Sequence, residues 1–218
     1  MAVGPDIVRF MNEARVNLPG ATDDNIQLAL FSVMDLFLKG SNTWQQDIVV
    51  PIGAKDPSGT IYAVVPEGPA VIDKLMWVFE QPKDPLDRPW RPIGAAMQTP
   101  GELTLFVQPS SATNYIVTVA LSVQDPTTRN GYVTFPAWIL AKYRDAILSG
   151  LRGRMMSQPS KPFTNTQLSV FHMRKFNSKV ARARVEVTRN NTYRQQAWAF
   201  PGFGRGSQRG NSGWGGPV

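Results

Sequence analysis

The sequence of 218 residues contains no cysteine and a single histidine, His172. Without thiols, disulfide bonds, thiolate metal sites and cysteine nucleophiles are all excluded. One histidine also has no imidazole partner with which to complete a zinc or iron site. We therefore expect no metal and no cofactor, and the lack of cysteine fits a reducing cytosol.

Long apolar runs are also absent, since none approaches the roughly 20 residues that a bilayer-spanning helix needs. Residues 1–10 include Asp6 and one arginine, and they lack the charged start and apolar core of a signal peptide. We expect a soluble protein that is not exported and has no contact with a membrane.

Catalytic signatures are scarce. No GxxxxGK[ST] sequence occurs, so the standard phosphate-binding loop is missing. Residues 202–206, GFGRG, resemble a dinucleotide-binding motif, but no strand is predicted before them and no helix after them. The pair Asp23-Asp24 is explained by the N-terminus of a helix. We expect a structural protein rather than an enzyme, and His172 is the best catalytic candidate of the enzyme alternative.

Positive and negative charges are separated along the chain. Residues 1–136 hold nine Lys and Arg against fourteen Asp and Glu, whereas residues 137–218 hold fourteen against two. The two segments carry net charges of −5 and +12 within a total of +7. The basic end suits an acidic partner, either nucleic acid or an acidic protein face; the alternative is a solvated helix face.

Apolar residues recur with helical spacing at both ends of the chain and with a period near two between them. The helical spacing predicts helices over residues 5–16, 22–39, 136–150 and 164–187. Between the helical pairs, turn residues punctuate short alternating segments. Strands are predicted at Gln46–Ile52, Thr60–Val65, Val71–Gln81, Leu103–Gln108 and Asn114–Val123.

These segments define an α+β fold. Residues 1–43 and 135–189 are expected to form two helical hairpins that pack as a four-helix bundle. Residues 44–134 are expected to form an inserted antiparallel sheet or sandwich, and residues 190–218 an extended C-terminal arm.

Local signals refine the helix ends. Gly40 is the expected C-cap of the second helix, and Thr164 with Gln167 three residues later is a capping box for the last helix. The residues expected on the apolar face of that last helix are Leu168, Phe171, Phe176, Val180, Ala183 and Val187.

Basic residues of the last two helices form a candidate subunit or channel surface. Its members are Arg144, Arg152, Arg154, Lys161, Lys175, Lys179 and Arg182. Helical spacing predicts that Lys175, Lys179 and Arg182 lie in one stripe opposite much of the apolar face. Such a stripe faces either phosphates or acidic side chains of a neighbouring subunit.

The C-terminal arm mixes arginines and aromatic residues in a glycine-rich setting. Its candidate partner-binding residues are Arg189, Tyr193, Arg194, Trp198, Phe200, Phe203, Arg205, Arg209 and Trp214. Three interpretations stay open: a peptide that docks in a protein groove, an RGG-like segment that binds nucleic acid, or an inert tail.

Residues 135–150 resemble the penultimate helix of the head-to-tail connector adaptors of short-tailed phages, of the tail tubular protein A type. That segment has a proline start and a "Y…AI..G" core. Residues 159–165 resemble the family's "P.KPW.N" turn, with Phe163 in place of tryptophan, and residues 176–184 resemble its "F…I..AR" helix. The glycine-rich end after Phe203 departs from the pattern.

The resemblance implies a ring of identical subunits, usually twelve, beneath the portal protein. Such a ring extends the DNA channel without sequence recognition and meets the tail nozzle or tube below, while the C-terminal segment clasps the portal. It implies a location in the neck of the virion, after assembly in the host cytoplasm. The alternative is an RNA- or DNA-binding module that uses the basic helix and the RG-type tail.

Overall fold

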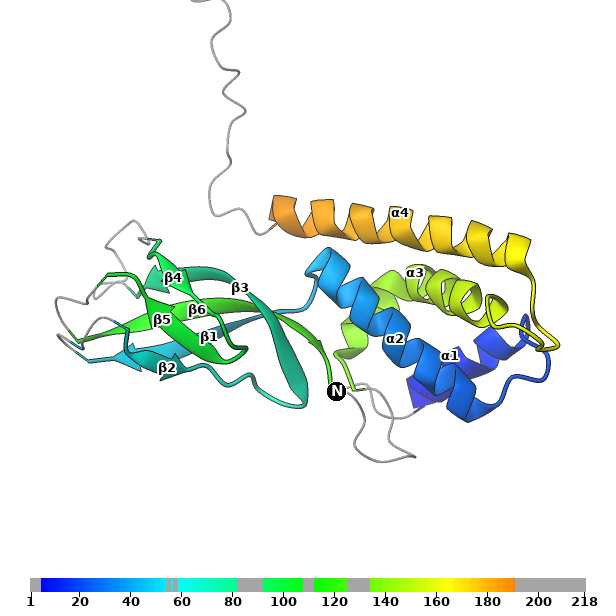
Figure 1. The fold of residues 1–218 in the computed structure, drawn as a ribbon, viewed down its shortest axis with the longest axis horizontal. Helices are drawn as coiled ribbons and strands as arrows, with labels where there is room; N and C mark the ends of the chain where they lie inside the picture. The colour runs from blue at the N-terminus through cyan, green and yellow to red at the C-terminus, as the bar shows by residue number, and fades with distance from the viewer. Residues whose placement is uncertain are drawn as a thin grey trace, which may run out of the picture.

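The structure, a computed structural model, describes residues 5–53, 56, 59–81, 92–107, 112–124 and 134–190 (Figure 1). Across these ranges the chain is an α+β protein with four helices and two small antiparallel sheets, which confirms the predicted class. The helices are α1 (Pro5–Arg15), α2 (Asp23–Ser41), α3 (Ala137–Met156) and α4 (Thr166–Asn190). The strands are β1 (Gln45–Ile52), β2 (Ile61–Ala63), β3 (Ala70–Glu80), β4 (Ala95–Ala96), β5 (Glu102–Leu105) and β6 (Thr113–Val123). Within the described ranges, no helix combines the length and hydropathy that a bilayer span requires.

The apolar sides of the four helices share one hydrophobic cluster. Fully buried Phe10 of α1 and Phe37 of α2 lie in it together with Phe176 of α4. At Gly150 of α3, an added Cβ would lie 2.7 Å from Phe176 and 2.7 Å from Val33. Because real Cβ atoms do not approach so closely, only glycine lets α2, α3 and α4 meet at this point.

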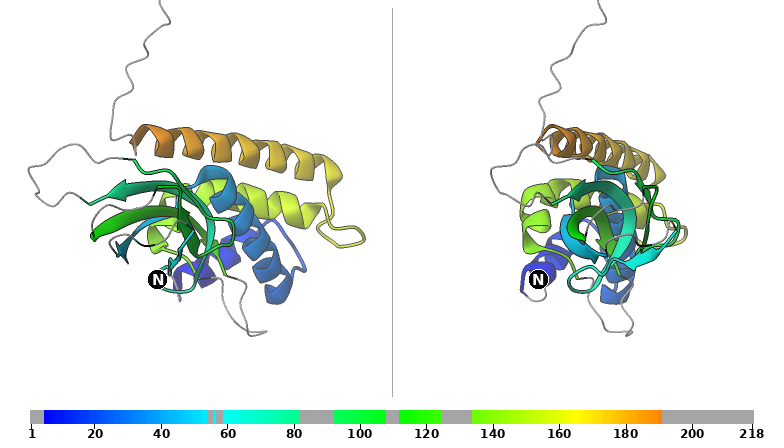
Figure 2. Two further views of the ribbon diagram at one scale, coloured as in Figure 1. Left: turned by 60° about the vertical axis from the view of Figure 1, so that its left-hand side comes forward. Right: turned by 90° about the vertical axis from the view of Figure 1, so that its left-hand side faces the viewer.

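The strands form two sheets, with the orders β1-β6-β3 and β2-β5-β4, and all described pairings are antiparallel. In β3 the register shifts at two places, between Ile72 and Lys74 and between Leu75 and Trp77. The sheets share a second hydrophobic cluster, to which β6 contributes Val117 and β5 contributes Leu103. Figure 2 shows the strands curling together at one end of the molecule, with the helices at the other.

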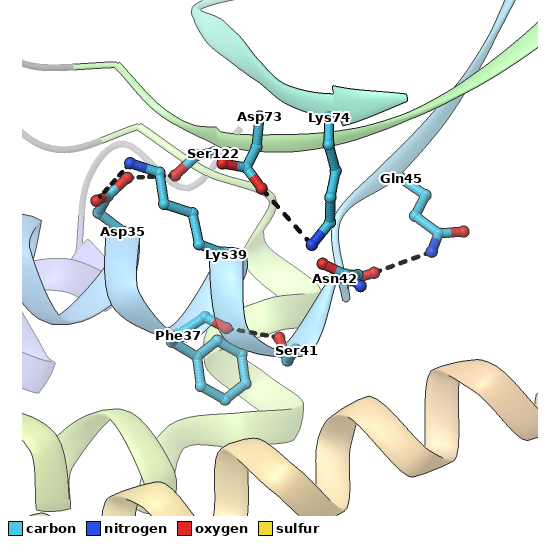
Figure 3. Close-up of polar contacts among 9 residues, drawn as sticks. All are labelled: Asp35, Phe37, Lys39, Ser41, Asn42, Gln45, Asp73, Lys74 and Ser122. Carbon is cyan, nitrogen blue, oxygen red and sulfur yellow. Dashed lines mark hydrogen bonds and ion pairs between the residues drawn. The ribbon is translucent and has the colours of Figure 1, made fainter. Parts of the chain in front are cut away.

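Polar contacts join α2 to the first sheet (Figure 3). Ser122 of β6 is 2% exposed, and its hydroxyl donates to Oδ1 of Asp35 at 2.7 Å. Lys39 Nζ lies 2.8 Å from the other carboxylate oxygen of Asp35. Next to this joint, Trp44 packs against both hydrophobic clusters.

The ends of two helices differ from the prediction. Asn42, not Gly40, caps α2: it adopts φ 54° and ψ 32°, and its N–H donates to the Leu38 carbonyl at 2.8 Å. Gly40 lies inside the helix, where an added Cβ would come within 2.7 Å of Val180. Glycine at position 40 therefore serves the contact between α2 and α4 and not the helix end.

The start of α4 is also shifted by one residue from the prediction. Asn165 is the residue before the helix, and its Oδ1 accepts a hydrogen bond from the Leu168 N–H at 3.0 Å. The Thr164 hydroxyl instead donates to the Gln158 carbonyl at 2.6 Å and accepts from the Lys161 N–H at 2.9 Å. Threonine here closes the turn between α3 and α4, and asparagine caps the helix.

The middle of the chain contains one strand more than predicted, the two-residue β4, which is too short to show a period. α3 continues past Gly150 to Met156. The expected C-terminal arm lies outside the described residues from position 191 onward.

Candidate interaction surface

α4 lies along one edge of the helical part, with α2 and α3 on one side of it (Figures 1 and 2). Phe176 and Ala183 point inward and are 2% exposed. At Gly153 of α3, an added Cβ would come within 2.8 Å of the Met173 side chain, and the Ser169 hydroxyl donates to the Gly153 carbonyl at 2.8 Å. The glycines of α3 thus let one side of α4 pack closely on α3. The opposite side of α4 faces away from α2 and α3.

Both acidic residues of α3 and α4 are engaged by lysines of the same chain. Asp145 of α3 pairs with Lys179 and lies 3.6 Å from Lys175. Glu186 of α4 lies 2.5 Å from Lys142 Nζ. The hydrogen bond between these last two raises the pKa of Lys142 and lowers the pKa of Glu186.

These pairs change the interpretation of three candidate surface residues. Lys175 and Lys179 both reach Asp145 of α3, while Lys175 stays 44% exposed and lies on nearly the same side of α4 as Arg182, seven residues further on. Arg144 pairs with Glu13, its Nε lying 2.8 Å from the carboxylate, and thereby ties α3 to α1. The three side chains hold the helices together and leave other residues to form an outer surface.

The outward side of α4 carries exposed residues at intervals of three and four. We define the outer face of α4 as Phe171, Arg174, Ser178, Arg182 and Val185. Phe171 is 59% exposed and Val185 49% exposed. This spacing places the five side chains on one side of a helix, opposite Phe176 and Ala183.

The composition of the outer face of α4 is basic and apolar. Within the described ranges, Arg174 and Arg182 form no ion pair, although Arg182 lies close enough to Glu186 to add to the effect of Lys142 in lowering the pKa of that carboxyl. Phe171 was predicted on the apolar face, and so was Leu168, which is 45% exposed. The prediction is wrong for these two residues, whereas it is confirmed for Phe176 and Ala183 of the same predicted face, which are buried.

The remaining candidates are spread around the turn between α3 and α4 and the end of α4. Arg154 and Lys161 are exposed, and so is Arg189 in the last turn of α4. Arg152 is partly buried, close enough to His172 to lower its pKa, and its Nε has no hydrogen-bond partner in the described part of the chain. Outside that part lie Tyr193, Arg194, Trp198, Phe200, Phe203, Arg205, Arg209 and Trp214.

A second exposed surface lies on the sheet β1-β6-β3 and was not singled out from the sequence. Register places Asp47, Thr118 and Trp77 side by side across the three strands, and Val49 beside Ile116 in the next row. Directly paired residues share one face of a sheet. Val49 is 55% exposed and Trp77 54% exposed, so this exposed sheet face has an apolar centre. The Thr118 hydroxyl donates to Asp47 at 2.6 Å.

The charge of the strand region is opposite to that of α3 and α4. Residues 45–124 hold eight Asp and Glu against five Lys and Arg, a net charge of −3. Residues 137–190 hold eleven Lys and Arg against two acidic residues, a net charge of +9. The net charge is therefore weakly negative in the strand region and strongly positive in the last two helices.

Residues with catalytic chemistry do not converge in the described ranges. No group of three His, Asp or Glu side chains there has the geometry of a metal site. One hollow of about 630 Å³ is lined by Pro51, Gly53, Gln81 and neighbouring residues without any titratable side chain. A second hollow of about 370 Å³ is lined by residues that include Asp73 and Lys74. The Asp73 carboxylate and the Lys74 ammonium group lie 3.9 Å apart.

In comparisons with known proteins, no protein-family model and no curated protein matches the sequence.

Proposed function

We propose that this chain is a structural adaptor of a tailed-phage neck. In this proposal identical subunits, twelve in number, form a ring that joins the portal protein to the tail nozzle or tube and continues the DNA channel. The chain is not an enzyme, and DNA passes through the lumen without sequence recognition. The observation that carries the proposal is the outer face of α4, a basic and apolar surface whose arginines form no ion pair in the described part of their own chain.

The order of the elements supports the same proposal. Two helices precede the strands and two follow them, as in the adaptor family that residues 135–150, 159–165 and 176–184 resemble. In the proposed arrangement the four helices act as one bundle, and the two sheets act as an inserted sandwich that reaches away from it. The C-terminal arm, residues 190–218, clasps the portal, and the assembled ring belongs to the virion neck.

Co-expression with a portal protein from the same genome tests the proposal. Electron microscopy of the purified complex should show a ring of this chain seated on the portal, coaxial with its channel. A truncated chain that ends at Phe200 should bind the portal more weakly, because it lacks the end of the arm. Failure of the full-length chain to bind the portal would overturn the adaptor function, and undiminished binding by the truncated chain would overturn the clasp.

A nucleic-acid-binding module is the second candidate, and Arg174 and Arg182 on α4 favour it. Its signature is an affinity for DNA or RNA that falls steeply with salt, with a log–log slope near −0.9 for each phosphate neutralised on duplex DNA. Titration of a labelled duplex at two salt concentrations distinguishes the two functions. The adaptor is expected to show weak binding without this steep dependence.

A further inference from the structure

We infer that one flank of the α3–α4 hairpin holds a phosphate-binding site formed by Arg152, His172 and Lys175. Arg152 and His172 each lie within two turns of the helix ends that the α3–α4 connection joins, far from the strands (Figure 1). The site uses none of the residues of the outer face of α4. It goes beyond the adaptor function proposed above and does not depend on it.

Close packing of α3 on α4 brings the members of the site together. An added Cβ at Gly153 would come within 2.8 Å of Met173. Arg152 and His172 are the sequence neighbours of these two residues, so the same contact holds them near each other. Lys175 follows His172 by three residues, a spacing that makes two side chains neighbours on a helix. Arg152 and His172 are partly buried and 44% of the Lys175 side chain is exposed, so the site is recessed but open to solvent.

The positive charge at this end of the flank has no carboxylate to balance it. Asp145 lies seven residues before Arg152, on nearly the same side of α3. Its two oxygens already face Lys175, at 3.6 Å, and a second lysine of α4. Residues 146–185 contain no Asp or Glu, and Arg152 forms no ion pair within the described ranges. A bound anion would supply the missing negative charge.

The surroundings of the imidazole agree with this charge imbalance. Burial lowers the pKa of His172, and the charges of Arg152 and Lys175 lower it further. The Nδ1 atom of His172 and the Nε atom of Arg152 are buried without a hydrogen-bond partner in the described part of the chain. An anion beside these groups would favour the protonated imidazole and so raise its pKa.

The chemistry of the three side chains points to phosphate as the ligand. Arg152 and Lys175 together offer two positive charges and several N–H donors, which match a doubly charged oxyanion better than a single carboxylate. Phosphate carries nearly two negative charges at neutral pH and has oxygens enough for all three side chains. Such a group is available as inorganic phosphate or as the monoester of a nucleotide, and both present the same oxygens.

NMR titration of the untagged full-length chain tests the site, because the chain has one histidine and its ring gives one Cε1–H signal. The pKa of His172 is measured at increasing phosphate, with chloride added to hold the ionic strength and therefore the screening constant. We expect a saturable rise of about one pH unit. By linkage, such a rise means that phosphate binds the protonated imidazole about tenfold more tightly than the neutral one. Sulfate, which stays doubly charged over this pH range, should act in the same way.

Variants of the two cations connect the response to the site. Arg152→Gln and Lys175→Gln should each weaken phosphate binding at least about tenfold, because each removes a charged donor. Arg152→Gln should also raise the pKa of His172 in the absence of phosphate. Arg184→Gln is the matched control, since it removes the same charge from an exposed position of α4, nine residues from Lys175 and on the opposite side of the helix. Circular dichroism should show the wild-type fold, above all for the exposed position 175.

The outcomes separate this inference from its alternatives. A pKa that does not respond to phosphate would overturn it, as would an equal rise with chloride alone or an equal loss of binding in Arg184→Gln. A response to a DNA duplex without terminal phosphates, but not to inorganic phosphate, would also overturn it and assign the cations to a nucleic-acid surface. A nucleoside 5′-monophosphate distinguishes the two sources: tighter binding than inorganic phosphate identifies a nucleotide, and equal binding identifies the free ion.

Discussion

His172 is partly buried where α4 packs on α3, and its Nδ1 has no hydrogen-bond partner within the described ranges. Burial lowers the pKa of this imidazole, and the nearby charges of Arg152 and Lys175 lower it further. The Phe171 ring lies 5.4 Å from the imidazole and offers no negative charge. These surroundings of His172, the best catalytic candidate from sequence, favour the neutral imidazole.

The lowered pKa predicts a loss of stability in mild acid. The unfolded chain takes up the proton near the ordinary histidine pKa of about 6.5, while the folded chain takes it up only at lower pH. Between these two values the unfolded state binds more protons, so the free energy of unfolding decreases as the pH falls. We expect the melting temperature of the wild type to fall more steeply than that of H172Q from neutral pH down through this window. Parallel curves for the two proteins would contradict the prediction.

Residue chemistry explains which parts of the candidate surface could be predicted. The excess of arginine and lysine in the last two helices is visible in the sequence, and Arg182 is on the surface as expected. The ion pairs of Lys175 and Lys179 with Asp145 on another helix were not predicted. Pairings between elements depend on how helices are rotated against each other, which a single-sequence pattern does not encode.

At the scale of elements, periodic segments were predictable and their ends were less so. The apolar spacing located all four described helices and five of the strands. Gly40 was mistaken for a cap because glycine serves two purposes, a left-handed turn and a close helix contact, and only the position of Val180 distinguishes them. The outward position of Phe171 was missed for a similar reason, since an exposed aromatic residue at an interaction surface has the same spacing pattern as a core residue.

The joint between α2 and β6 depends on the carboxylate of Asp35. Asp35→Ala would leave the buried Ser122 hydroxyl without its acceptor, which costs about 1–3 kcal/mol of the free energy of unfolding. Asp35→Asn is the matched control, because its amide oxygen can still accept the bond. Urea unfolding should show a lower midpoint for the alanine variant and a smaller change for the asparagine variant. Equal losses in both would instead assign the effect to the ion pair with Lys39.

At the scale of the whole molecule, charge and packing divide the chain along the same line. Residues 45–124 have a net charge of −3, and residues 137–190, which include α3 and α4, have a net charge of +9. The sequence predicted this separation but not the exposed sheet face around Trp77, because the pleat decides which side chains point outward. The two hydrophobic clusters follow the same division, and Trp44 packs against both.

Substitution of Trp44 therefore tests whether the helical and strand parts unfold as one cooperative unit. If its contacts couple them, the dilute wild type should unfold in a single calorimetric transition, with equal calorimetric and van't Hoff enthalpies. Trp44→Ala should separate this into two transitions or raise the calorimetric enthalpy above the van't Hoff value. Trp77→Ala is the matched control, because that indole is 54% exposed and belongs to neither cluster, so its loss should leave one transition. A Trp44→Ala protein that melts earlier but still in one transition would show that other contacts, such as Asp35 with Ser122, couple the two parts.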